Sequence, residues 1–146
     1  MSAKADLSLI VRRSIRASVT RCFEAWTRPD QLLRWWGPEG VKCTSAEVEA
    51  RLGGRYCIGN ELPGGEVLWI EGEFLAFEPP EKLVYTWSVR DKTKTPERVT
   101  VRFEARGDLT EVVVIHEQIG DESTRTSHES GWVGCLSGLE SHLASD

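Results

Sequence analysis

The sequence lacks the features that mark membrane, secreted or nucleic-acid-binding proteins. It has no run of roughly 18 or more apolar residues, which a membrane-spanning helix requires, and residues 1–6 contain no apolar core of a signal peptide. Basic residues are not in excess, since 18 Lys and Arg stand against 23 Asp and Glu, a net charge of -5. We therefore expect a cytoplasmic protein that inserts into no membrane and binds no nucleic acid.

Motifs for metals, cofactors and known catalytic sites are also missing. The four cysteines form no Cys-x-x-Cys pair, so we interpret them as buried apolar side chains rather than zinc ligands or redox groups. The three histidines, His116, His128 and His142, have no carboxylate or cysteine at metal-ligand spacing. No phosphate-binding loop, dinucleotide glycine motif or Gly-x-Ser-x-Gly occurs. The sequence thus predicts neither a metal nor a cofactor and assigns no catalytic residue.

Length and composition are those of one folded domain. The chain has 146 residues, of which 40% are hydrophobic and 28% charged, and single domains commonly have about 100–150 residues. No repeat or linker divides it, so we expect one domain over residues 1–146, with its core between about Leu7 and Ala144. Six tryptophans are many for this length and indicate a large apolar surface.

The first part of the chain predicts a strand and two short helices. Residues 7–16 alternate between apolar and polar, the period of a half-buried strand. Ser18 is placed to cap a helix over residues 19–26, whose apolar side chains recur every three or four positions. Pro29 fits the first turn of a second short helix, which we expect to stop at Gly37-Pro38.

The rest of the chain predicts a meander followed by a long helix. Between Val41 and Ile119 the alternation continues, with glycine or proline at each expected reversal, which indicates about six antiparallel strands. Residues 123–144 carry apolar side chains at three- and four-residue steps, which predicts a helix. The expected fold class is α+β, a curved antiparallel sheet wrapped around the long C-terminal helix, with two short helices after the first strand.

The alternation also assigns side chains to the two faces of the sheet. Ala50 and Leu52 are expected to point inward together with Val48, and the even-numbered residues 68–74 likewise. Trp69 falls on the outer face, where a half-exposed indole could contact a partner or a second copy of the chain.

Three glycines lie along one flank of the long helix. Gly131, Gly134 and Gly138 each reduce helix propensity by up to about 1 kcal/mol relative to alanine. Either they leave room for a ligand, in which case a leucine at Gly138 would fill that room, or they allow a close approach of the helix backbone to its neighbours.

Short motifs in order along nearly the whole chain resemble the family named for the activator of the 90-kDa heat-shock-protein ATPase. The resemblance implies a helix-grip fold of the START-like (SRPBCC) superfamily, which includes lipid-transfer domains, plant allergens and polyketide aromatase/cyclases, and it implies no single function. The family name adds a link to chaperones and the stress response. The matching segments are Ile15–Val19 with Phe23–Thr27, Leu33–Pro38, Glu49–Gly54, Gly72-Glu73, Pro79–Trp87, Thr110–His116 and Gly131-Trp132.

Three functions remain open at this point. The leading hypothesis is binding of a small hydrophobic ligand, aromatic or lipid-like, in a cavity between the sheet and the C-terminal helix. The alternatives are a chaperone-associated interaction module and a polyketide cyclase or dehydratase-like enzyme. In the enzyme, His116, His128 and Tyr85 would transfer protons; otherwise the histidines are orienting groups with satisfied hydrogen bonds. We expect a binding protein more than an enzyme.

The inward rows and one face of the long helix supply the expected ligand site. Its predicted lining residues are Tyr56, Ile70, Phe74, Tyr85, Trp87, Val101, Phe103, Val114, His116, His128, Trp132 and Cys135.

Overall fold

The computed structural model describes residues 6–37, 40–93 and 95–144. The elements in chain order are β1 (Leu7–Ile15), α1 (Val19–Thr27), α2 (Pro29–Trp35), β2 (Lys42–Val48), β3 (Arg55–Glu61), β4 (Val67–Glu78), β5 (Lys82–Val89), β6 (Glu97–Arg106), β7 (Leu109–Ile119) and α3 (Glu122–Ala144). Their order and type confirm the predicted α+β fold. The expected stop signal after α2 includes Pro38, which lies outside the described residues.

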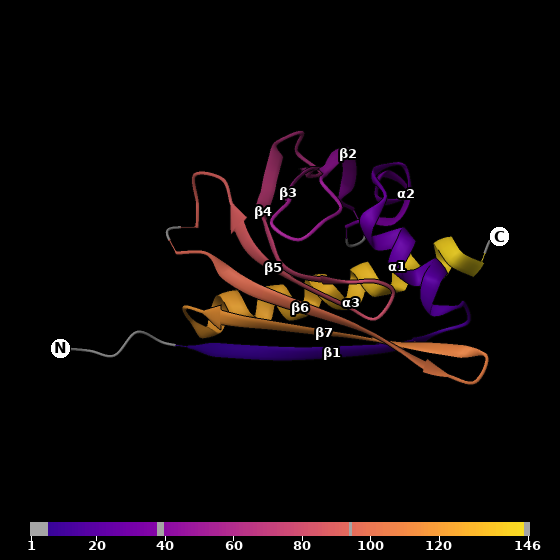
Figure 1. The fold of residues 1–146 in the computed structure, drawn as a ribbon. Helices are drawn as coiled ribbons and strands as arrows, with labels where there is room; N and C mark the ends of the chain where they lie inside the picture. Colours follow the sequence, from indigo (N-terminus) through magenta and orange to yellow (C-terminus); the bar gives the residue numbers. More distant parts are fainter. Residues whose placement is uncertain (1–5, 38–39, 94, 145–146) are drawn as a thin grey trace.

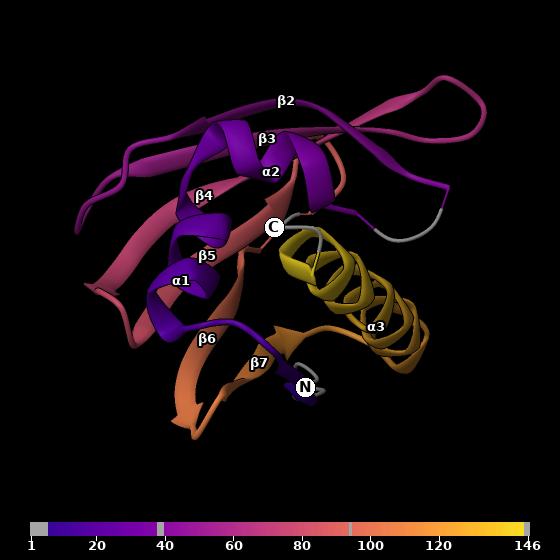
Figure 2. The same ribbon diagram turned by 90° about the vertical axis from the view of Figure 1, so that its right-hand side faces the viewer.

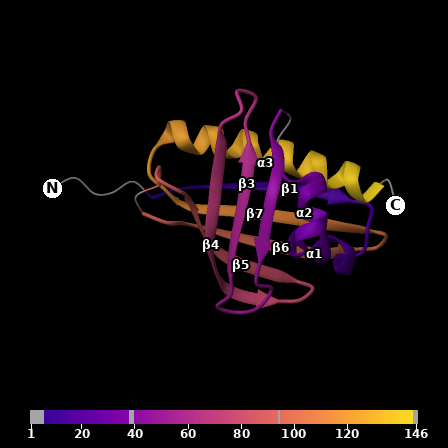
Figure 3. The same ribbon diagram turned by 90° about the horizontal axis from the view of Figure 1, so that it is seen from above.

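All the strands form one antiparallel sheet in the order β1-β7-β6-β5-β4-β3-β2. The meander runs from β2 to β7, and β1 adds to its far end by pairing with β7. The sheet bends strongly, so that β2–β4 run across the direction of β1, β7 and α3 (Figure 3). Seen nearly along its axis, α3 lies within this curve, with α1 and α2 beside it (Figure 2). The helix grip is therefore confirmed (Figure 1).

Local sequence signals act where they were expected. Ser18 Oγ accepts the backbone N–H of Arg21 at 3.1 Å and caps α1. Pro29 occupies the first turn of α2, where its missing N–H breaks no helical hydrogen bond. Gly53 and Gly107 have φ values of 77° and 64° in the turns before β3 and β7, a conformation that glycine adopts without steric strain.

The two faces of the sheet are mostly as predicted. Val99, Val101 and Phe103 are buried on the inner face, and Trp69 on β4 is half-exposed under the guanidinium of Arg90, 5.4 Å from the ring centre. The inward assignment of two residues is wrong, because β2 ends at Val48 although the alternation in the sequence continues beyond it. Both are exposed in the turn before β3: Ala50 and Leu52.

The cysteines are free thiols, and one of them departs from the expected burial. Cys22, Cys43 and Cys135 are buried, as interpreted from the sequence. Cys57 on β3 is only half-buried and lies 3.6 Å from a guanidinium nitrogen of Arg90. Among the described residues no helix is both long and apolar enough to cross a membrane.

The helix glycines separate into the two roles that the sequence left open. A Cβ atom at Gly138 would lie 2.9 Å from the backbone oxygen of Trp35, so this glycine allows α3 to approach the end of α2. A Cβ at Gly131 would meet no atom within 4 Å. The expectation that a leucine at Gly138 fills a ligand cavity is therefore wrong, because backbone already occupies that space.

Alanine at these two glycines is expected to change stability in different directions. Gly131→Ala should raise the free energy of unfolding by up to about 1 kcal/mol, because alanine restores helix propensity without a clash. Gly138→Ala gains the same propensity but pushes against Trp35, and it should be less stable than Gly131→Ala. Urea denaturation of both variants measures the difference, and equal stability would contradict the assignment.

Candidate functional site

A cavity of about 240 Å³ lies between one face of α3 and the inner side of β3, β4 and β5. Gly131 is part of its wall, and the missing side chain there widens the space. The lining is mainly apolar, as is usual for small-molecule sites. It consists of Trp36, Val41, Asn60, Leu62, Leu68, Ile70, Trp87, Val89, Ser127, His128, Gly131, Trp132 and Cys135.

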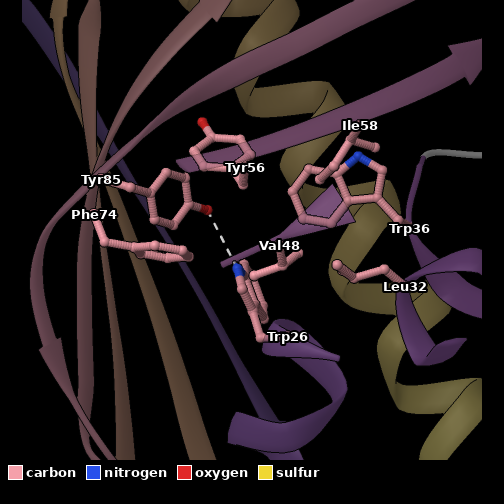
Figure 4. Close-up of a pocket in the computed structure, with 8 residues that line it drawn as sticks. All are labelled: Trp26, Leu32, Trp36, Val48, Tyr56, Ile58, Phe74 and Tyr85. Carbon is pink, nitrogen blue, oxygen red and sulfur yellow. Dashed lines mark hydrogen bonds between the residues drawn. The ribbon is translucent and has the colours of Figure 1, made fainter. Parts of the chain in front are cut away.

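A second, much smaller hole of about 20 Å³ lies under α1 and α2 (Figure 4). Trp26 Nε1 donates a hydrogen bond to the Tyr85 hydroxyl at 3.2 Å across it, and the Tyr56 hydroxyl donates to the backbone oxygen of Thr86. This volume is about that of a single water position, so the region is aromatic core rather than space for an organic ligand. Trp36 belongs to the walls of both spaces.

The predicted lining residues are distributed over three environments. The larger cavity is lined by Ile70, Trp87, His128, Trp132 and Cys135. The small hole is lined by Tyr56, Phe74 and Tyr85. Fully enclosed by other side chains are Val101, Phe103, Val114 and His116. Tyr85 therefore lies at a different space from His128, and burial raises the pKa of its hydroxyl.

Several lining residues were not chosen from the sequence. Leu68 lies on the expected inward row of residues 68–74, and Val89 alternates with the predicted Trp87 along β5, so alternation carries a usable signal for both. Asn60 alternates with the buried Tyr56 and Ile58 along β3, and a polar residue on an inward row is itself a signal. Trp36, Val41 and Leu62 lie at or beyond the ends of elements, where periodicity gives no direction.

A cluster of the buried Glu97 and His116 with the half-buried His128 adjoins the cavity through His128. Glu97 begins β6, His116 lies on β7, and His128 is in the second turn of α3. Glu97 Oε1 is 2.7 Å from His116 Nε2 and 3.0 Å from His128 Nε2. The two imidazole rings stack with centroids 4.5 Å apart. The sequence shows no carboxylate at metal-ligand spacing from the histidines, but the fold supplies one, because β-sheet pairing and the return of α3 bring Glu97 to both.

The start of α3 positions this cluster. Asp121 Oδ1 accepts the backbone N–H of Thr124 at 2.7 Å and caps the helix. His128 and Trp132, one turn apart, then share the face turned toward Trp87, whose ring centre is 6.1 Å and 5.5 Å from theirs. This part of the prediction, that the two side chains project from one helix face, is confirmed.

The hydrogen bonds fix the protonation of His116. Trp132 Nε1 can only donate, and it lies 3.0 Å from His116 Nδ1, so Nδ1 must be the unprotonated acceptor. The ring proton of neutral His116 is then on Nε2, from which it is donated to Glu97. Burial lowers the pKa of His116, although the bond to Glu97 opposes this. Burial raises the pKa of Glu97, but the hydrogen bonds from His116 and His128 outweigh it and lower that pKa to about 2.

The same cluster has the ligand types of a metal site, but its hydrogen bonds do not fit one. Two histidines and a carboxylate bind zinc or iron in many proteins, and their ligand atoms here lie within 4.8 Å of one another. A metal on His116 Nε2 would move the ring proton to Nδ1, directly opposite the N–H of Trp132. Histidine ligands normally donate this second N–H to an acceptor. The donor set therefore favours a hydrogen-bonded network over a metal.

The lowered pKa of His116 predicts loss of stability in mild acid. The unfolded chain takes up a proton near the ordinary histidine pKa of about 6.5, whereas the folded protein does so only at lower pH. The free energy of unfolding should therefore fall from pH 7 to pH 5, by up to about 1.4 kcal/mol per pH unit for one proton. Urea denaturation across this range tests it, with His116→Gln as a variant that should show a smaller slope.

A polar recess of about 570 Å³ adjoins the cavity and shares Leu68, Val89 and His128 with it. Glu97 and Lys92 also belong to its wall. His128 therefore stands between the apolar cavity and a recess whose wall includes charged side chains.

Comparisons with known proteins agree with this architecture. The family described as Activator of Hsp90 ATPase homolog 1-like protein matches residues 16–144, and no curated protein matches the sequence. Solved structures of similar fold include a protein of Chromobacterium violaceum, with 24% identity and a TM-score of 0.85 over 92% of this chain and 94% of that one. The AHSA1 protein of Silicibacter pomeroyi has 24% identity and a TM-score of 0.85 over 94% and 98%.

A protein of Nitrosomonas europaea is similar as well, with 20% identity and a TM-score of 0.82 over 95% of both chains. Identities at this level establish a shared fold and leave function open. The family match covers most of the chain, from the end of β1 to the end of α3. The resemblance found in the sequence is confirmed: the chain belongs to the family of Activator of Hsp90 ATPase homolog 1-like proteins.

Proposed function

We propose that this protein binds a small apolar molecule in the cavity between α3 and β3–β5. The observation that carries the proposal is the cavity of about 240 Å³ with its largely apolar wall. The cavity is partly open to the surface, so a small molecule can enter it, and concave apolar spaces are the usual form of a small-molecule site. A space of this size in a domain with so large an aromatic core needs an explanation, and a bound ligand supplies one.

The volume limits the size of the ligand. An apolar cavity of about 150 Å³ holds one benzene ring in another protein, and this cavity measures about 240 Å³. One or two fused rings fit this space. A long acyl chain or a sterol would have to extend into the adjoining polar recess, which disfavours the lipid-like alternative.

A thermal-shift screen tests the proposal. The purified protein is heated with one- and two-ring aromatics, larger polyketide-like aromatics, fatty acids and sterols. A ligand at about 100 times its Kd stabilises by about 2.7 kcal/mol, which raises the Tm of a domain of this size by about 5–10 °C. We expect such shifts for the small aromatics. No shift across the whole panel would contradict ligand binding and would direct the search to protein partners, a chaperone first.

Proton transfer on a bound molecule is a second candidate, favoured by the contact between Glu97 and His128. Glu97 accepts the Nε2 proton of His128, which leaves Nδ1 as the basic atom. Among the described residues, Nδ1 of His128 has no hydrogen-bond partner, whereas both ring nitrogens of His116 are already bonded. His128 would therefore be the general base and His116 a positioning residue.

Compounds that bind can be used to test for this chemistry. Each is incubated with the wild-type protein and with His128→Gln, and product is followed by mass spectrometry. Turnover by the wild type and loss of turnover with unchanged binding in the variant would support the enzyme. Absence of any product, or equal product from both proteins, would reject it and leave the binding function in place.

A further inference from the structure

Two buried polar atoms in the cavity wall have no hydrogen-bond partner among the described residues. They are the side-chain oxygen of Asn60 on β3 and the indole nitrogen of Trp87 on β5. The two residues are 5% and 8% exposed, and both line the larger cavity. Most buried polar groups in native proteins are paired, so two unpaired groups in one wall point to something that this wall receives.

Three other buried indoles nearby are satisfied within the protein. Trp26 donates to the hydroxyl of Tyr85, Trp35 donates to the backbone oxygen of Ala25, and Trp132 donates to the ring of His116. The aromatic core thus provides acceptors for its own N–H groups. Trp87 differs because it faces the cavity wall as well as the Glu97 cluster.

The two unpaired atoms differ in what they require. An indole N–H can only donate and needs an oxygen or nitrogen acceptor, whereas the oxygen of the Asn60 amide needs a donor. A hydroxyl group can accept from the first and donate to the second, and a carbonyl can satisfy the first. A pure hydrocarbon satisfies neither and leaves both groups unpaired.

The charges around the cavity exclude an anionic ligand. None of the described lysines or arginines lines the larger cavity. The carboxylate of the neighbouring cluster is Glu97, held by the two histidines, and the lysine of the adjoining recess, Lys92, pairs with Glu66 at 3.8 Å. A carboxylate placed in this apolar space would lack a counter-charge and be repelled by Glu97.

From these observations we infer that the ligand is an uncharged one- or two-ring molecule that carries a hydroxyl group, which pairs with the indole N–H of Trp87 or with the amide oxygen of Asn60. The inference rests on the proposed function and adds the chemistry of recognition to it. Fatty acids and aromatic carboxylates are thereby excluded as the preferred occupants, and so are unsubstituted hydrocarbons.

Three matched probes test the inference at pH 7: 2-naphthol, naphthalene and 2-naphthoate. Their affinities for the full chain are measured by titration calorimetry or by quenching of tryptophan fluorescence. We expect 2-naphthol to bind about tenfold or more tightly than either of the others. Naphthalene lacks the hydroxyl group, and 2-naphthoate carries a negative charge in its place. If naphthalene or 2-naphthoate binds as tightly as 2-naphthol, the inference is overturned and the cavity remains a ligand site. If none of the three probes binds, both the inference and the proposed function are contradicted.

Variants of the wall separate recognition from packing. Asn60→Leu keeps the approximate volume of the side chain and removes the amide, and the empty protein should keep its Tm or gain a few degrees. The preference for 2-naphthol over naphthalene should decrease in this variant or in Trp87→Phe, whichever residue pairs with the hydroxyl. The control is Leu68→Ala. Leu68 lines the same cavity, so this variant should weaken the binding of 2-naphthol and of naphthalene equally.

The stability of the empty Asn60→Leu protein is itself decisive. A clear fall in its Tm would mean that the amide already has a partner, such as a buried water, and would overturn the inference. An unchanged preference for 2-naphthol in Asn60→Leu and in Trp87→Phe would overturn it as well.

Discussion

Removal of the carboxylate of Glu97 is expected to be among the most destabilising single changes in the protein. In Glu97→Ala the Nε2 protons of His116 and His128 lose their shared acceptor. His116 is fully buried and cannot turn to water. Hydrogen bonds to charged groups contribute roughly 1.5–3 kcal/mol each, and an unpaired buried donor costs about 1–3 kcal/mol. We expect the free energy of unfolding of Glu97→Ala to be about 2–4 kcal/mol lower than that of the wild type. Urea denaturation at pH 7 measures this difference.

Glu117→Ala is the matched control on the neighbouring strand. Glu117 pairs with Arg98 at 3.2 Å on the outer side of the sheet, where its side chain is 34% exposed. Such half-exposed pairs contribute about 0–1 kcal/mol. Glu97→Gln retains an oxygen acceptor, so its free energy of unfolding should lie between those of Glu97→Ala and Glu117→Ala. If the two alanine variants lose the same stability, the Glu97 cluster has no special structural role.

Filling the cavity from α3 is expected to abolish ligand binding without unfolding the protein. Gly131 lines the cavity, and a Cβ there meets no atom within 4 Å, so the side chain of Gly131→Leu has room to enter the space of about 240 Å³. We expect the affinity for a small aromatic ligand to fall at least about 100-fold, or roughly 2.7 kcal/mol. The free energy of unfolding should stay the same or rise, because leucine favours the helix over glycine.

The control for this prediction is Val133→Leu on the same helix. Val133 is 49% exposed and does not line the cavity, so its replacement should leave both affinity and stability nearly unchanged. Fluorescence titration with a ligand from the thermal-shift screen measures the affinities. Retained affinity in a folded Gly131→Leu protein would place the ligand elsewhere. Gly138→Leu is unsuitable, because the Trp35 backbone makes a clash that lowers stability for another reason.

The cavity and the cluster act on different properties of the protein. Glu97 and His116 hold β6, β7 and α3 together, so their changes act first on stability and its pH dependence. Gly131 and Asn60 belong to the wall, so their changes act on binding. His128 belongs to both groups, and its replacement is informative only when stability and binding are measured on the same sample.

Periodicity predicted the architecture because the signals of helices and strands are local. The caps at Ser18 and Pro29 and the turn at Gly107 lie within a few residues of the elements they begin or end. The alternation failed at Leu52, where the chain leaves β2 and turns before β3. An alternating pattern of residues continues through that turn although the strand does not, and no local signal separates the two.

The candidate site was only partly accessible from the sequence. His128 and Trp132 are one turn apart, so their common face follows from helix geometry. Glu97 is 19 residues from His116 and 31 from His128, and its contact with them depends on the register of β6 with β7 and on the return of α3. No spacing rule relates residues on three different elements.

By itself, the sequence determined the order of the elements and the inner faces of most strands, because these depend on composition and on neighbours within one or two turns, and its motifs carried the resemblance to the family. Tertiary structure alone decided that Gly138 packs against Trp35 while Gly131 opens onto a cavity, since both are glycines on one helix and differ only in what lies opposite. It also decided that Asn60 and Trp87 lack partners. Space and pairing are properties of packed surfaces, and the packing joins segments that the sequence keeps far apart.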